Sequence, residues 1–417
     1  MKTLKNIFKN KELRIKILIT LSLLLIYKIG TILKLPTVGN ISNTDTSSLI
    51  ILMNYVSGSF LEKFSLFSLG ITPYITASIV VQLLGMGVIP AFERWRNEGE
   101  SGHKKTEKAT YIAAIILALI EAIVLTNTFN SSYSALKNNS TLNFILTAGM
   151  LFMGSLLTLL IARIIDRKGI GNGASLIIFT GIVSRIFYDI YLTAKDMINI
   201  NQIYTIGLFI LYILFFILIM GLIIFIDKSV RKIKIEYSKQ SNEFSNNQST
   251  IPIKVNIASV IPVIFTVSIL SGFAFIGAFT KINIFNNIAD YNSLLGYIVY
   301  IILILLFSVF YGKEVYNAKT ISDNLRKSNA VIQGKLPGND TERYLDKIIN
   351  HMTIFGGISL IIIASIPILV TAITHSNYNL TLGGTSMMIL SGVAIETMSE
   401  IKARIKTIKT KKQSLFD

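Results

Sequence analysis

Apolar runs about 20 residues long recur along almost the whole chain. A helix needs roughly 20 apolar residues to cross a hydrocarbon core about 30 Å thick, so each run is long enough to span a membrane. No stretch between the runs is long enough to build a separate soluble domain. The sequence therefore predicts one bundle of ten transmembrane helices, with spans near residues 15–34, 71–90, 110–128, 142–164, 174–194, 203–226, 257–279, 292–311, 352–374 and 383–401.

The composition agrees with an integral membrane protein. Hydrophobic residues make up 52% of the chain and charged residues 15%, and the mean hydropathy is +0.59. The basic amino terminus and the first apolar run look like a secretion signal, but the run is too long and no small-residue cleavage site follows it. We therefore expect a retained first span. Cysteine is absent, which excludes disulfides and thiol chemistry.

Positive charge is concentrated on one side of the predicted membrane. If the amino terminus is cytoplasmic, 33 of the 40 Lys and Arg residues lie in cytoplasmic segments, 6 lie on the opposite side, and Lys28 lies within the first span. This asymmetry is the one that the positive-inside rule describes. The net charge of +17 is thus explained by topology rather than by nucleic-acid binding, and both termini are predicted to be cytoplasmic.

Two long basic loops, 227–256 and 312–350, are predicted on the cytoplasmic side. Two interpretations of these loops stay open. Their charge fixes the orientation of the chain whatever else it does. It can also dock an acidic or charged partner.

The chain contains a weak internal repeat. ITASIV at 75–80 and FTVSIL at 265–270 each follow a proline, Pro73 and Pro262. The two segments lie in the second and seventh spans, which are equivalent members of two five-span halves, 1–202 and 203–417, that run in opposite directions. Paired proline-interrupted spans in inverted halves indicate a central substrate site.

Catalytic and cofactor motifs are missing from the sequence. It has no GxxxxGK[ST] phosphate loop, and its three histidines are far apart and form no metal-ligand spacing. We therefore expect neither an enzyme nor a bound cofactor or metal. Two carboxylates within spans, Glu121 and Glu396, leave a secondary transporter as the alternative, because intramembrane charges are often functional.

Seven stretches in order along the chain resemble the successive signatures of the SecY family, the ten-span channel subunit of the bacterial protein-export machinery. A single stretch would be weak evidence, but the set covers the whole chain and is very specific. YKIGT at 27–31 also fits the first span of the family. The seven stretches are FSLFSLGITPYITASIVVQLL (64–84), NEGESGHKKTEKAT (97–110), DRKGIGNGASLIIFTGIVSRI (166–186), IPIKVNIASVIPVIF (251–265), SDNLRKS (322–328), PGNDTERYLDKI (337–348) and LGGTSMMI (382–389).

The resemblance implies an all-α membrane protein that conducts unfolded polypeptide. Two five-helix halves would clamp an hourglass pore, and a lateral gate between the second and seventh spans would release hydrophobic segments into lipid. A narrow apolar ring would seal the pore, because such a constriction excludes water and ions. Carried over position by position, the ring is Ile71, Ile75, Ile178, Ile182, Ile264 and Ile389.

The resemblance also assigns a plug and gate positions. The plug would be the segment NYVSGSFLEKF at 54–64, a short helix that closes the outer funnel, and its glycine and serines would make it marginal as an isolated helix. The plug residues are Asn54, Ser57, Gly58, Leu61 and Phe64, and the lateral-gate residues are Thr76, Gln82 and Thr266.

The basic loops would then dock the SecA ATPase motor or a translating ribosome, and SecE-like and SecG-like small membrane subunits would accompany the chain. The sequence departs from the family pattern at 235–250, and Leu336 replaces an arginine before a proline. Such departures fit either an accessory SecY with its own SecA or sequence drift. A membrane insertase without a through-pore is a third possibility. The docking residues are Lys232, Lys234, Lys239, Arg326, Lys327, Lys335 and Arg343.

Overall fold

The computed structural model is built largely from helices. It describes residues 10–38, 65–85, 89–133, 141–199, 203–237, 249–257, 259–280, 282–290, 293–374 and 384–413. Within these residues, each of the ten predicted spans overlaps a helix. The helices are α2 (Lys11–Gly30), α4 (Thr72–Leu83), α5 (Pro90–Asn97), α6 (Glu100–Tyr133), α7 (Thr141–Lys168), α8 (Gly173–Asn199), α9 (Ile203–Lys228), α10 (Ile261–Thr280), α11 (Asn283–Ala289), α12 (Leu294–Val315), α13 (Ala318–Lys327), α14 (Asn339–Thr374) and α15 (Gly384–Gln413).

Several helical segments are long and apolar enough to cross a membrane. In the part of the chain that the structure describes there are four of them: Glu100–Thr128, Thr141–Lys168, Leu294–Lys327 and Asn339–Ile366. Shorter apolar helical segments lie in α4, α8 and α10. The apolar runs of the sequence are therefore helical, as their length predicts.

The chain forms two compact units. The first consists of Met1–Tyr191, Val267–Gly296 and Val393–Asp417, and the second of Leu192–Thr266 and Tyr297–Gly392. These units group residues by their contacts in space, whereas the predicted halves, 1–202 and 203–417, divide the chain by its topology in the membrane. The two inverted halves stay a prediction.

The first unit is organised around α4 and α6, which pack along each other, while α7 packs against both α6 and α2. The segment before α4 lies against α2 and its following turn. The Leu66 amide donates to the Leu33 carbonyl oxygen at 3.0 Å, and the Phe67 ring stacks on Tyr27 with centroids 5.7 Å apart. Tyr27 is fully buried by this contact.

Two glycines permit this close approach. A Cβ atom at Gly30 of α2 would lie 2.0 Å from the Phe67 ring, and one at Gly154 of α7 would lie 1.8 Å from the Leu66 carbonyl oxygen. Small residues let membrane helices and their neighbours approach closely. The start of α4 is therefore held between α2 and α7.

The second unit contains a three-stranded antiparallel sheet in the order β2-β1-β3. Its strands are β1 (Val230–Tyr237), β2 (Ser249–Lys254) and β3 (Ala330–Ile332). In the register of the sheet, Ile233 is opposite Ile251 and Ile235 is opposite Ile332. The sheet thus joins two regions that are separate basic loops in the sequence-based prediction.

The sequence prediction did not include this sheet, although the signal is present. In β1 the buried Ile233 and Ile235 alternate with the exposed Lys232, Lys234 and Glu236. Strict alternation of apolar and polar residues is the period of a half-buried strand. The high positive charge of this segment instead favoured its interpretation as a basic loop.

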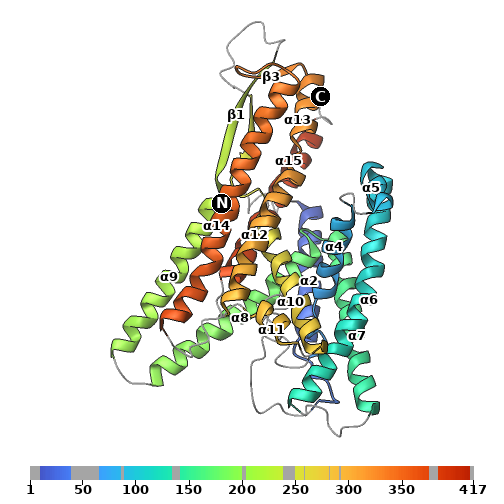
Figure 1. The fold of residues 1–417 in the computed structure, drawn as a ribbon, viewed down its shortest axis with the longest axis vertical. Helices are drawn as coiled ribbons and strands as arrows, with labels where there is room; N and C mark the ends of the chain where they lie inside the picture. Colours follow the sequence, from blue (N-terminus) through green and yellow to red (C-terminus); the bar gives the residue numbers. More distant parts are fainter. Residues whose placement is uncertain are drawn as a thin grey trace. The chain divides into compact units, whose positions relative to one another are not determined.

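One face of the sheet packs on α13 and the first turns of α14, and Figure 1 shows these elements gathered at one end of the unit. Leu345 and Ile253 are completely buried in the shared core, which also receives Leu325 from α13. The Asn317 side chain caps α13 by accepting from the Thr320 amide at 3.1 Å. This core fixes the sheet on the long helix α14.

Small residues also bring α12 close to α14. The Ser308 hydroxyl of α12 donates to the Thr353 carbonyl oxygen of α14 at 3.0 Å. One turn further along, a Cβ atom at Gly312 would lie 1.7 Å from the Thr353 methyl group. A hydrogen bond between helices and a missing side chain are typical devices of helix packing in membranes.

Candidate functional site

Four of the six predicted ring residues lie in the first unit. Ile71 and Ile75, from the start of α4, are 2% and 7% exposed, and Ile178 and Ile182, from α8, are each 3% exposed. In each pair the members are four residues apart, which places them on one side of a helical turn. All four are therefore apolar side chains that are shielded from water within the first unit.

The start of α4 is fixed by its backbone chemistry. Gly70 has a φ of 56°, a left-handed conformation that glycine adopts without strain. The Ile71 carbonyl oxygen accepts from the amides of Tyr74 and Ile75 at 3.1 and 3.2 Å. Pro73 lies in the first turn, where its missing amide costs no hydrogen bond.

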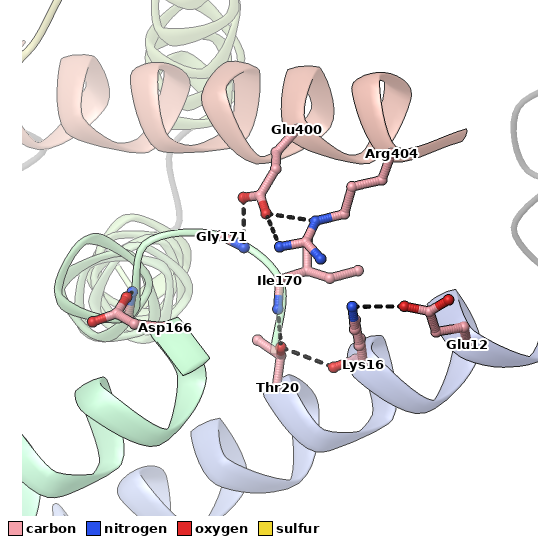
Figure 2. A network of polar contacts seen from close by, with 9 residues as sticks. Glu12, Lys16, Thr20, Asp166, Ile170, Gly171, Glu400 and Arg404 are labelled. Atoms are coloured by element: carbon pink, nitrogen blue, oxygen red, sulfur yellow. Dashed lines mark hydrogen bonds and ion pairs between the residues drawn. The ribbon is translucent and has the colours of Figure 1, made fainter. Parts of the chain in front are cut away.

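The start of α8 is fixed by the turn 169–172, which three neighbouring segments hold (Figure 2). The Thr20 hydroxyl of α2 accepts from the buried Ile170 amide at 3.0 Å. The Asp166 carboxylate of α7 accepts from the Gly173 amide at 2.7 Å, so it caps the first turn of α8. This turn sets the position of the helix that carries Ile178 and Ile182.

The third contact to the turn comes from α15. The Glu400 carboxylate accepts from the Gly171 amide at 2.9 Å and also pairs with Arg404, which lies 2.7 Å away (Figure 2). Gly171 has a φ of 86°, so the turn requires a glycine there. These residues have no role in the sequence-based prediction, although the glycines around Asn172 are a recognisable turn signal.

The two remaining ring residues belong to the second unit. Ile389 in the first turns of α15 is 4% exposed, and Ile264 in the first turn of α10 is half-buried. The starts of these two helices are closely packed, because a Cβ atom at Gly392 would lie 2.2 Å from the Val260 side chain. The assignment of all six isoleucines to one ring stays a prediction.

The predicted gate residues are polar groups that bond mainly within their own helices. Thr76 donates to the Thr72 carbonyl oxygen at 3.1 Å, and Thr266 donates to the Pro262 carbonyl oxygen at 2.8 Å. Gln82 is exposed and donates to the Ser78 hydroxyl at 3.0 Å. These bonds satisfy polar side chains within their own helices, which lowers the free-energy cost of placing polar groups in an apolar helix. Their role in a gate is not tested by the geometry of either unit.

The predicted plug, 54–64, and Lys239 lie outside the described residues. The plug assignment and the docking role of Lys239 therefore stay predictions.

The other predicted docking residues are all exposed on the sheet-bearing end of the second unit. Lys232 and Lys234 project from β1, and Arg326 and Lys327 end α13. Lys335 and Arg343 come together in an open groove with a volume of about 860 Å³. The groove lies between β1, the loop after β3 and the first turns of α14.

Three basic residues of this groove were missed in the sequence. They are Arg231 from β1 and Lys347 and His351 from α14. Arg343, Lys347 and His351 follow one another at intervals of four residues, which is the spacing of one helix face. That periodicity could have identified the α14 residues, whereas Arg231 joins them only through the fold.

Comparison with protein families identifies the chain. A family model described as SecY matches residues 65–398, most of the sequence. The chain belongs to the SecY family. It is 37% identical over 420 residues to the protein translocase subunit SecY of Staphylococcus carnosus, with 97% of each chain covered. It is 34% identical over 415 residues to the protein translocase subunit SecY 1 of Lactobacillus kefiranofaciens subsp. kefiranofaciens, with 96% of each covered.

Solved structures share the SecY fold. A protein-conducting channel matches with a TM-score of 0.70 at 18% identity, covering 94% of this chain and 92% of the other. Sec61 in the canine ribosome-channel complex matches with a TM-score of 0.65, again at 18% identity and with the same coverage. The helical, SecY-like membrane fold predicted from the sequence is therefore confirmed, apart from the added three-stranded sheet, and the chain is a multi-pass membrane protein.

Proposed function

We propose that this chain is the protein-conducting channel of a bacterial Sec translocase, which passes unfolded preproteins across the plasma membrane. The observation that carries the proposal is the identity of 36–37% to proteins named translocase subunit SecY, over 97% of the chain. The match includes the spans and the loops between them. The chain therefore has the whole framework that a SecY channel uses, not one module of it.

In this proposal the six isoleucines form the constriction of the pore. Four of them are buried in the first turns of α4 and α8, and hydrogen bonds to neighbouring segments fix the start of α8. An apolar constriction opposes ion flow because it excludes water, yet it binds no particular peptide side chain. Polar groups at Thr76, Gln82 and Thr266 would line a seam through which hydrophobic segments leave laterally, and 54–64 would close the outer funnel as a plug.

The proposed partners supply what the channel lacks. A SecA-type ATPase or a ribosome would provide the driving force and dock on the basic loops, and SecE-like and SecG-like subunits would accompany the chain in the membrane. Both termini and the sheet would face the cytoplasm, because the positive-inside rule places Lys and Arg there.

A specialised version of this function is an accessory system that exports dedicated surface proteins. The exposed Leu336 in the docking loop favours it. An exposed aliphatic side chain among basic groups is complementary to a different partner surface than a uniformly charged loop is. Cross-linking of the loops to a housekeeping SecA, together with rescue of general export, would contradict the accessory role.

Ion conductance tests the channel itself. Replacing Ile75 and Ile264 by Asn should hydrate the constriction and make proteoliposomes leak ions, with a clear rise in conductance over the unsubstituted protein. Leu83→Asn is the matched control, because Leu83 is a half-buried residue of α4 outside the predicted ring. It should leave conductance unchanged.

The same measurement separates the alternative functions. A secondary transporter of inverted-repeat fold would not gain an ion leak from the isoleucine substitutions, and its transport would depend on a polar site such as Glu121, which is 5% exposed within α6. An insertase without a through-pore would fail to export a wholly soluble passenger. Unchanged conductance in the double variant would overturn the channel proposal.

A further inference from the structure

Three buried aromatic rings join the beginning of α10 to α12. Phe265 of α10 is 6% exposed, and Phe307 and Tyr311 of α12 are 3% and 7% exposed. The Phe265 ring lies edge-on to the Phe307 ring, with centroids 5.8 Å apart and an interplanar angle of 85°. It also lies edge-on to the Tyr311 ring, at 5.0 Å and 76°. Edge-to-face contacts add attraction beyond the burial of apolar area, so Phe265 bridges the two helices through two specific contacts.

The same stretch of α12 is held on α14 by a different face. Phe307 and Tyr311 are four residues apart, and each is followed directly by a small residue, Ser308 or Gly312. The Ser308 hydroxyl donates to the Thr353 carbonyl oxygen of α14 at 3.0 Å, and a Cβ atom at Gly312 would overlap the Thr353 side chain. Since α12 directs rings to α10 and small residues to α14, Phe265 connects the beginning of α10 to a fixed pair of helices.

Ile264, a member of the proposed constriction, directly precedes Phe265. It is half-buried, whereas Val263 and Phe265 on either side of it are 0% and 6% exposed. Successive side chains of a helix point about 100° apart, so a contact that fixes the direction of Phe265 also fixes that of Ile264. The chain passes from the second unit to the first within α10, after Thr266. The turns that carry Ile264 are therefore anchored in the second unit, and Phe265 supplies an aromatic part of that anchor.

We propose that Phe265 is a positioning residue of the pore constriction. Its contacts with Phe307 and Tyr311 set the rotation of the first turns of α10 and so keep Ile264 in the closed ring. The inference rests on the proposed function, because it takes Ile264 to belong to that ring. An apolar constriction excludes water only while its side chains stay close together, so a rotated Ile264 would admit water and ions.

A purely structural role is the competing explanation, because buried aromatic residues fill the core of many proteins. Phe310 allows the two roles to be separated. Its ring lies edge-on to Phe307 at 6.5 Å and to Tyr311 at 5.9 Å, and all three residues belong to α12. Loss of the Phe310 ring therefore removes two edge-to-face contacts, as loss of the Phe265 ring does, but leaves the contacts to α10 in place.

The test measures the ion conductance of the full chain in proteoliposomes. Phe265→Leu keeps an apolar side chain but removes both contacts to α12, so the resting conductance should rise about tenfold as a loosened α10 becomes more populated. Phe310→Leu is the matched control, and its conductance should stay within about twofold of the unsubstituted protein. Thermal unfolding should shift equally in the two variants, because each loses two ring contacts.

Variants of α12 test the same contacts from the other side. Phe307→Leu should also leak, and it tests the inference even if Phe265→Leu fails to fold. Combining Phe307→Leu with Phe265→Leu should raise conductance less than the product of the two single effects, because residues in contact are not additive. Tyr311→Phe keeps the ring that meets Phe265, so its conductance should stay low.

The absence of cysteine also allows the position of α10 to be followed directly. A spin label on the single thiol of Ile264→Cys should become more mobile when Phe265→Leu is added and should be unaffected by Phe310→Leu. This measurement reports how firmly residue 264 is held and does not depend on ion conduction.

Three results would overturn the inference. The first is conductance or label mobility that Phe265→Leu leaves unchanged, and the second is an equal leak in Phe310→Leu. The third is a fully multiplicative effect of Phe265→Leu and Phe307→Leu. Failure of the proposed function is a separate result, in which substitution of Ile75 and Ile264 by Asn causes no leak. The spin label would then still show whether Phe265 holds the beginning of α10.

Discussion

Asp227 and Asn256 form a buried polar pair at the base of the sheet. Asp227 is 8% exposed at the end of α9, Asn256 is 3% exposed before α10, and the Asn256 amide donates to the Asp227 carboxylate at 2.7 Å. Burial raises the pKa of Asp227, although the bond from Asn256 and the nearby Lys254 oppose the shift. Because a raised folded-state pKa favours the protonated form, Asp227 stabilises the fold at low pH and loses this contribution as the pH rises through that pKa.

Substitution at Asp227 separates its charge from its hydrogen bond. Asp227→Asn removes the ionisation, so the free energy of unfolding should depend less on pH and should be equal or higher at neutral pH. Asp227→Ala leaves the buried Asn256 amide without its acceptor, which should cost about 1–3 kcal/mol. Thermal unfolding of the detergent-purified protein between pH 4 and pH 8 measures both effects. A neutral-pH stability lower in Asp227→Asn than in Asp227→Ala would contradict this account.

At the scale of elements, the turn 169–172 brings α2 and α15, two helices that are distant in sequence, together at the end of α7. Its amides bond Thr20 of α2 and Glu400 of α15, while Asp166 of α7 caps α8 (Figure 2). The bonds to Thr20 and Glu400 could not be read from the sequence, since they depend on which distant helices become neighbours. What the sequence does contain is the glycine-rich turn itself and the polar residues at helix ends.

Thr20→Val tests how much this turn depends on α2. The substitution keeps the shape of the side chain but leaves the buried Ile170 amide without an acceptor, so we expect a loss of about 1–3 kcal/mol and faster hydrogen exchange in the turn. Thr158→Val is the matched control, because among the described residues the Thr158 hydroxyl bonds only the Gly154 carbonyl oxygen of its own helix. Equal exchange of the turn in the two variants would show that Thr20 does not hold it.

At the scale of the whole molecule, the sequence was sufficient for the features that depend on local composition. Apolar runs set the positions of the helices, and the ordered motifs are specific enough to indicate the SecY family on their own. Features that depend on pairing between distant segments were missed. The sheet needs residues 230–237 to meet 249–254 and 330–332, and the basic groove needs Arg231 to lie near α14.

The orientation of the whole chain in the membrane is the remaining global prediction, and the absence of cysteine makes it directly measurable. A single introduced cysteine is the only thiol, so an impermeant maleimide reports which side of the membrane it occupies. Gln333→Cys, at the exposed sheet-bearing end, should be labelled in inverted vesicles and protected in intact spheroplasts, because Lys and Arg are retained in the cytoplasm. Asn139→Cys, between the third and fourth predicted spans, should show the opposite pattern. Labelling of both from the same side would contradict the predicted topology, since an odd number of predicted spans separates the two positions.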